Sequence, residues 1–182
     1  MKQAKNSNLV TSLAALALLV CVAAPCKQLK SIGNPTVVKS ADGKFQITVP
    51  AGWQQDAFTS TKTDMKAGNL ADELYVMVIN ERKSDFTDET TLDDYTKLVR
   101  DATMENLIGP QGTQPLPLTI NGNQGRQYEI QGSTKNVKIA YLITTVETGE
   151  FFHQIVTWTL ASRKEQNEAK LLEVTNSFRS TQ

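Results

Sequence analysis

The sequence VKIAYLITTVETGEFFHQIVTWTL, residues 137–160, contains two long runs rich in β-branched and aromatic residues. Residues of these types favour strands. The segment Glu147-Thr148-Gly149-Glu150 separates the two runs and has the composition of a connecting loop. We therefore predict a long antiparallel pair of strands over residues 137–146 and 151–160.

Two earlier regions also have strand patterns. Residues 45–49 alternate apolar and polar side chains, and Asp42-Gly43 predicts a hairpin that pairs them with residues 36–39. Residues 73–81 are apolar on both alternating faces, which indicates a central strand covered on both sides. Residues 54–72, between these strands, are polar and are predicted to form a loop.

A second hairpin is predicted after the middle of the chain. Asn121-Gly122 is a strong turn signal and joins a strand at 118–120 to a strand at 124–131. Residues 112–117 are predicted to form the loop that leads into this hairpin.

Two helices are indicated by capping patterns. Thr91, with Asp94 three residues later, predicts a helix start, and Gly109-Pro110 marks the end of that helix. Ser162 with Glu165 is a capping box that predicts the start of a last helix. The order of elements therefore predicts an α+β fold, an antiparallel sheet of about six strands with helices packed on it as an α-β-α sandwich.

The N-terminus has the composition of an export signal, which we assign to residues 1–25. Lys2 and Lys5 precede an uncharged apolar run at residues 9–22, and Ala23 and Ala24 follow it. The run is shorter than the roughly 20 residues that a membrane-spanning helix needs.

Two modes of cleavage remain open. A lipoprotein signal would end before Cys26, whose thiol would take a diacylglyceryl group, although Pro25 is an unfavourable preceding residue. The alternative is ordinary cleavage after Ala23. Both cysteines, Cys21 and Cys26, lie in this segment, so the body has no thiol to pair with Cys26, and lipidation explains its presence. Lipid attachment at Cys26 is therefore the prediction.

The composition of the chain restricts the classes of domain and partner. Residues 26–36 contain Gly33 and Pro35 and are predicted to be a tether, followed by one domain over residues 37–182. The chain has 19 basic and 19 acidic residues and a net charge of zero, which argues against nucleic acid as a partner. Without cysteine, the body can use neither disulfides nor thiolate-held metal ions.

Three motifs carry a resemblance to a known family. They are F-x-I-x-V-P-x-G-W at residues 45–53, I-N-G-x-x-G at 120–125 and N-S-F-R at 176–179. In this order the chain resembles the PsbP/DcrB-like superfamily of small α-β-α sandwich proteins, which are common among exported and lipid-anchored bacterial proteins. The resemblance implies a non-enzymatic role, as an accessory subunit of a membrane complex or as an envelope lipoprotein. Its intracellular chaperone branch does not fit an export signal.

The residues themselves offer little chemistry. His153 is the only histidine and shares a strand face with Phe151 and Ile155, so we interpret it as structural rather than as a base or metal ligand. No nucleophile elbow or nucleotide-binding motif occurs. The acidic group at Asp85, Asp88, Glu89, Asp93 and Asp94 lacks the order of a calcium loop, and acidic residues favour a helix start without any ligand. We expect no catalytic residue, metal or cofactor.

Two tryptophans are candidates for a recognition surface. Trp158 lies on a strand and is predicted to be core. Trp53 follows a turn and is either core or an exposed rim residue beside the 54–72 loop, where it would bind a partner.

The predicted function is that of a non-catalytic, exported and lipid-anchored envelope protein. It would be held at the membrane through Cys26 and would bind an envelope protein as an accessory or binding module, through a sheet edge or the 54–72 loop. Without lipidation it would be periplasmic or secreted. The alternative is a periplasmic carrier or sensor of a small apolar or cationic ligand, held in a dry pocket between sheet and helix.

Overall fold

The computed structural model describes residues 33–60 and 63–181. The predicted signal, Cys26 and most of the predicted tether therefore lie outside the described residues. The last tether residue, Thr36, already belongs to the first strand.

A seven-stranded antiparallel sheet forms the centre of the fold, in the order β3-β4-β9-β8-β7-β5, with β6 also paired to β7. Its strands are β3 (Met65–Asn69), β4 (Leu74–Arg82), β5 (Ile108–Gly112), β6 (Leu116–Ile120), β7 (Asn123–Thr134), β8 (Val137–Thr148) and β9 (Phe151–Leu160). The predicted long pair, β8 and β9, is confirmed and stays in register from Ile139↔Leu160 to Thr148↔Phe151. The first five residues of β4 are all buried, which confirms that this strand is covered on both faces.

A second, three-stranded sheet packs on the first. Its order is β1-β2-β10, with β1 (Thr36–Lys39), β2 (Phe45–Val49) and β10 (Arg179–Ser180). The hairpin predicted at Asp42-Gly43 is confirmed. The predicted sheet of about six strands is the seven-stranded sheet, and the hairpin belongs to the second sheet. The inward side chains of β2 pack on the face of the large sheet, so β2 does not extend that sheet at its edge.

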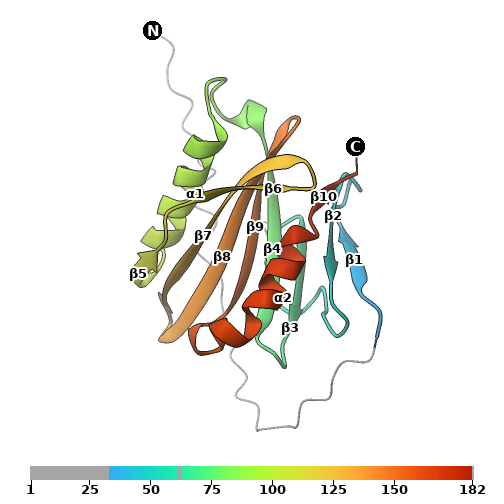
Figure 1. The fold of residues 1–182 in the computed structure, drawn as a ribbon, viewed down its shortest axis with the longest axis vertical. Helices are drawn as coiled ribbons and strands as arrows, with labels where there is room; N and C mark the ends of the chain where they lie inside the picture. Colours follow the sequence, from blue (N-terminus) through green and yellow to red (C-terminus); the bar gives the residue numbers. More distant parts are fainter. Residues whose placement is uncertain (1–32, 61–62, 182) are drawn as a thin grey trace.

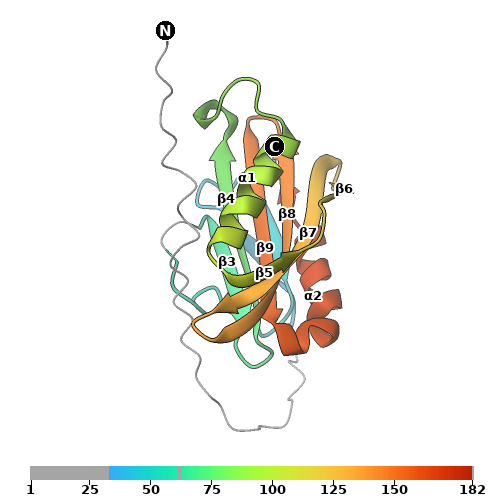
Figure 2. The same cartoon turned by 90° about the vertical axis from the view of Figure 1, so that its left-hand side faces the viewer.

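Two helices complete the layers, α1 (Leu92–Glu105) and α2 (Lys164–Asn176). Helix α1 covers one face of the large sheet, and α2 together with the small sheet covers the other (Figures 1 and 2). Two separate apolar clusters fill the interfaces. The cluster toward α1 is rich in aromatic side chains, and the cluster toward α2 includes Phe45, Val76, Ile155, Val174 and Phe178. The predicted α-β-α sandwich is thus confirmed.

Three local predictions need correction. Residues 54–72 contain β3, an edge strand held by β4, although Gly68 and Asn69 disfavour a strand locally. Gly109 and Pro110 were predicted to mark the end of the first helix. They lie instead in strand β5, whose backbone is extended because it pairs with β7. Ser162 caps no helix, because a 3₁₀ turn at Ala161–Arg163 precedes α2 and the N-cap residue, Arg163, makes no side-chain capping bond.

Candidate functional site

His153 lies at the junction of the two sheets. Its ring is fully buried beside Phe45 of β2, 4.5 Å between ring centres, and Phe178, 4.9 Å. Nδ1 lies 2.7 Å from Asn80 Oδ1, and Nε2 lies 2.6 Å from Thr148 Oγ1. Because an amide oxygen only accepts, Nδ1–H donates to Asn80 and Nε2 accepts from the Thr148 hydroxyl.

Burial, with a smaller effect of the Lys83 charge, lowers the pKa of His153 to about 3. The ring is therefore neutral at physiological pH and has both nitrogens satisfied. This confirms the structural interpretation of His153.

The three resemblance motifs meet beside this histidine. Phe45 of the first motif stacks on Phe178 of the third, with 6.2 Å between ring centres. Ser177 accepts a hydrogen bond from Thr48 N and donates to the carbonyl oxygens of Val174 and Thr48. Asn121 of the second motif donates to the carbonyl oxygens of Asn176 and Phe178, at the end of α2. The three motifs therefore have a structural role, which is to hold β2 and the β6–β7 turn against the end of α2.

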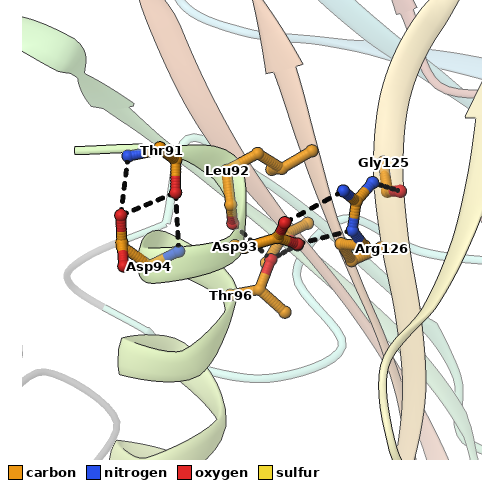
Figure 3. Close-up of polar contacts among 8 residues, drawn as sticks. Thr91, Leu92, Asp93, Asp94, Thr96, Gly125 and Arg126 are labelled. Atoms are coloured by element: carbon orange, nitrogen blue, oxygen red, sulfur yellow. Dashed lines mark hydrogen bonds and ion pairs between the residues drawn. The ribbon is translucent and has the colours of Figure 1, made fainter. Parts of the chain in front are cut away.

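The acidic residues near α1 have structural roles (Figure 3). The Thr91 hydroxyl accepts from Asp94 N, and the Asp94 carboxylate accepts from Thr91 N, so the predicted capping box is confirmed. The Asp93 carboxylate forms a two-point ion pair with Arg126 of β7, with distances of 2.6 and 3.2 Å. Within residues 33–60 and 63–181, no group of three or more acidic, histidine or cysteine side chains could hold a metal ion.

Both tryptophans belong to the core. Trp158 is 2% exposed, as predicted, and Trp53 is 8% exposed and packs in the cluster toward α2. An exposed indole, which the partner-binding interpretation of Trp53 requires, is not present. The turn Ala51-Gly52 directs the chain inward, so Trp53 fills the interface between sheets rather than its rim.

The space between the large sheet and α2 is almost filled. A cavity of about 10 Å³ lies there, beneath the ion pair of Lys164 with Glu129. This volume is that of about one water molecule. Among the described residues, this cavity is too small to be the ligand pocket that the carrier hypothesis expects between sheet and helix.

A larger, open pocket of about 370 Å³ lies where the β1–β2 turn faces the end of β4. One wall comes from the small sheet and the other from the large sheet, and Phe45 and Phe151 form apolar parts of the lining. The other lining residues are Ser40, Ala41, Asp42, Asp64, Asn80, Arg82 and Asp85. The volume lies in the range of about 300–1,000 Å³ that is usual for ligand sites.

Negative charge predominates in this pocket, with three carboxylates against the single guanidinium of Arg82. A hydrogen bond from Ser40, reinforced by one from Lys44 N, lowers the pKa of Asp42. Partial burial, and to a lesser degree the charge of Asp42, raises the pKa of Asp64, whose carboxylate accepts from Asn80 N. The Arg82 guanidinium lies over the Phe151 ring, 5.1 Å from its centre. The arrangement favours a positively charged group as occupant.

The lining residues were not predicted as a group. In the sequence, Asp85 belongs to the acidic group before α1 and Asp42 to a predicted turn. Nothing in the sequence around Asp64 or Asn80 indicates a functional role. Only the packing of one sheet on the other brings them together, and Asn80 connects this pocket to His153 through its side-chain oxygen.

The edges of the large sheet disfavour strand addition. Residues 108–120 form one edge, on which Ile108 is 70% and Leu116 is 68% exposed. Pro110, Pro115 and Pro117 interrupt this edge and have no N–H to offer an added strand. At the other edge, Gln54 already forms a two-bond bridge to Gly68 of β3, with both distances 2.8 Å.

No family model and no curated protein sequence matches the chain. Among solved structures, CyanoP, the cyanobacterial PsbP of Synechocystis sp. PCC 6803, is similar over 86% of this chain and 98% of its own, with 17% identity and a TM-score of 0.60. The fold is PsbP-like. LpqN, involved in cell envelope biogenesis of Mycobacterium tuberculosis, has a TM-score of 0.62 and 15% identity, with 81% of this chain and 91% of LpqN covered.

The PsbP-like fold agrees with the resemblance that the three motifs indicated. At these identities the likeness concerns the fold alone. Among the described residues, no helix has the length and apolar character needed to cross a membrane.

Proposed function

We propose that this protein is a non-catalytic, lipid-anchored envelope protein that binds another protein through the pocket between its two sheets. The observation that carries the proposal is this open, negatively charged pocket on a fold whose sheet-to-α2 interface is filled. The similarity to LpqN, a protein of envelope biogenesis, supports the compartment. The export signal and Cys26 support the anchor.

A basic side chain of a partner protein is the occupant that fits the pocket. Asp42, Asp64 and Asp85 place carboxylates around it, and Phe151 offers an aromatic surface. A lysine or arginine side chain could place its charge among these carboxylates. Such a partner would bind by side-chain insertion, which agrees with the proline-interrupted edge at residues 108–120.

The test is affinity capture from detergent-solubilised membranes of the source cell. A pocket variant carries Asp42→Asn, Asp64→Asn and Asp85→Asn, and a control variant of equal charge change carries Glu165→Gln, Glu168→Gln and Glu173→Gln on α2. We expect the control variant to capture as much partner as the wild type and the pocket variant to capture at least about tenfold less. An unchanged partner set with the pocket variant would exclude the pocket as the binding site.

The anchor is tested separately. An inhibitor of lipoprotein signal peptidase should cause a slower-migrating precursor to accumulate, and Cys26→Ala should abolish that effect. If no precursor accumulates, the protein is not lipidated and only the binding function remains.

A further inference from the structure

His153 is a buried polar residue at the junction of the two sheets. His153 of β9 contacts Phe45 of β2 and Phe178, which directly precedes β10. It is held on the large-sheet side by Asn80 of β4 and Thr148 of β8. The small sheet therefore packs on a neutral imidazole surrounded by aromatic rings.

Among the residues that the structure describes, no carboxylate bonds to either ring nitrogen of His153. Both ring nitrogens bond to neutral partners, and Val146, its partner across β8, is apolar. Lys44 and Arg82 lie over the neighbouring Phe151 ring, and Lys83, whose charge contributes to lowering the pKa of His153, pairs with Glu147. The carboxylate of Asp64 reaches the network only through the backbone N–H of Asn80.

We propose that the junction between the two sheets is a pH-sensitive latch, in which protonation of His153 separates β2 and β10 from β9. A charged imidazolium without an anionic partner is costly in a buried site and is hydrated once the sheets separate. The cluster toward α1 lies on the opposite face of the large sheet and does not include His153, so we expect the large sheet and α1 to stay paired when the small sheet separates.

The direction and size of the effect follow from linkage. Burial lowers the pKa of His153 to about 3 in the closed form, while a hydrated ring titrates near 6.5. Acid therefore stabilises the open form, and between pH 7.5 and pH 5.0 the open population should rise about 30-fold.

The latch would also control the pocket. The wall on the small sheet is formed by Ser40, Ala41, Asp42 and Phe45. The wall on the large sheet includes Asp64, Asn80 and Arg82. Separation of the sheets at low pH would remove one wall and release whatever the pocket holds. The latch itself does not depend on the proposed partner, because it is measured on the protein alone.

Hydrogen exchange of the purified protein at pH 7.5 and pH 5.0, corrected for intrinsic exchange rates, tests the latch. We expect amides of β2 and β10 to lose about 30-fold of protection at pH 5.0, while amides of β7 and β8 change by less than about threefold. In His153→Gln, whose side chain does not titrate, the difference between the two pH values should disappear. Asp64→Asn is the matched control and should keep the wild-type difference.

Equal loss of protection in all strands, or a retained pH effect in His153→Gln, would overturn the latch. If the Gln variant does not fold, the wild type still decides the matter, because its single histidine gives one resolvable ring signal in an NMR titration. The ring of the closed form should stay neutral between pH 7.5 and pH 5.0 while the open population grows. A ring that is protonated within the closed form would exclude the mechanism.

Discussion

Gly125 shows how one residue determines the spacing of three strands. It lies on β7 between Val146 of β8 and Leu118 of β6. A Cβ at this position would lie 2.9 Å from the carbonyl oxygen of Thr145 and 3.2 Å from Leu118 Cδ2. We expect Gly125→Ala to lower the free energy of unfolding by about 1–3 kcal/mol, measured by urea denaturation, because backbone must shift to admit the methyl group.

The control for this prediction is Gly149→Ala, in the β8–β9 turn. A Cβ there meets nothing within 4 Å. The free energy of unfolding should change by less than about 0.5 kcal/mol. Similar losses in both variants would mean that the loss of glycine, rather than the close contact, is responsible.

Single residues also show how much of the candidate site could be predicted from the sequence. His153 was correctly expected to be buried or paired with a neighbour rather than to act as a base or metal ligand, because it has no second histidine beside it. The pocket could not be predicted, because Asp42, Asp64 and Asp85 come from three separate segments. Their proximity results from face-to-face packing of two sheets, which leaves no periodic signal in the sequence.

At the scale of elements, the two helix starts have similar sequences and different structures. Thr91 caps α1 with its hydroxyl, whereas Ser162 lies in the 3₁₀ turn before α2. We expect Thr91→Ala to lower the free energy of unfolding by about 1 kcal/mol, because an N–H at the start of α1 loses its acceptor. Thermal or urea unfolding measures the change.

Ser162→Ala is the matched comparison, since both variants remove a hydroxyl from a capping-box pattern. Its effect should stay below about 0.5 kcal/mol, because the side chain caps no helix. A loss as large as that of Thr91→Ala would contradict the assigned start of α2.

The elements that were predicted correctly are those with strong local patterns. Strands β4, β8 and β9 are apolar over long runs, and the turns at Asp42-Gly43 and Asn121-Gly122 have residues suited to positive φ. Strands β3 and β5 have the sequences MKAGN and IGPQG, whose glycine and proline favour loops. Both are edge strands, so hydrogen bonds to a neighbour, rather than local propensity, make them extended.

For the molecule as a whole, the edge at residues 108–120 affects self-association. It is uncharged, with exposed Ile108 and Leu116, so the prolines are its main protection against pairing with a second copy. We expect Pro117→Thr, which restores an N–H, to increase self-association in sedimentation velocity relative to wild type. Adding Leu116→Lys should reverse the increase, because a charge on the edge opposes pairing.

If Pro117→Thr sediments like the wild type at all concentrations, then the proline does not protect this edge. Loss of helical and strand signal in circular dichroism would distinguish unfolding from edge pairing. The measurement thus separates a folded assembly from an aggregate of unfolded chains.

The position of β10 has a consequence for the order of folding. Strand β2 pairs with β10 near the end of the chain, and Thr48 bonds to Ser177, 129 residues later. Pairing between such distant segments forms slowly, because the entropy cost of closing a long loop comes before any stabilising contact is made. A chain that emerges N-terminus first therefore leaves this edge of β2 without its partner strand until residues 179–180 have appeared. During this interval the backbone N–H and C=O groups of that edge are free to pair with another strand.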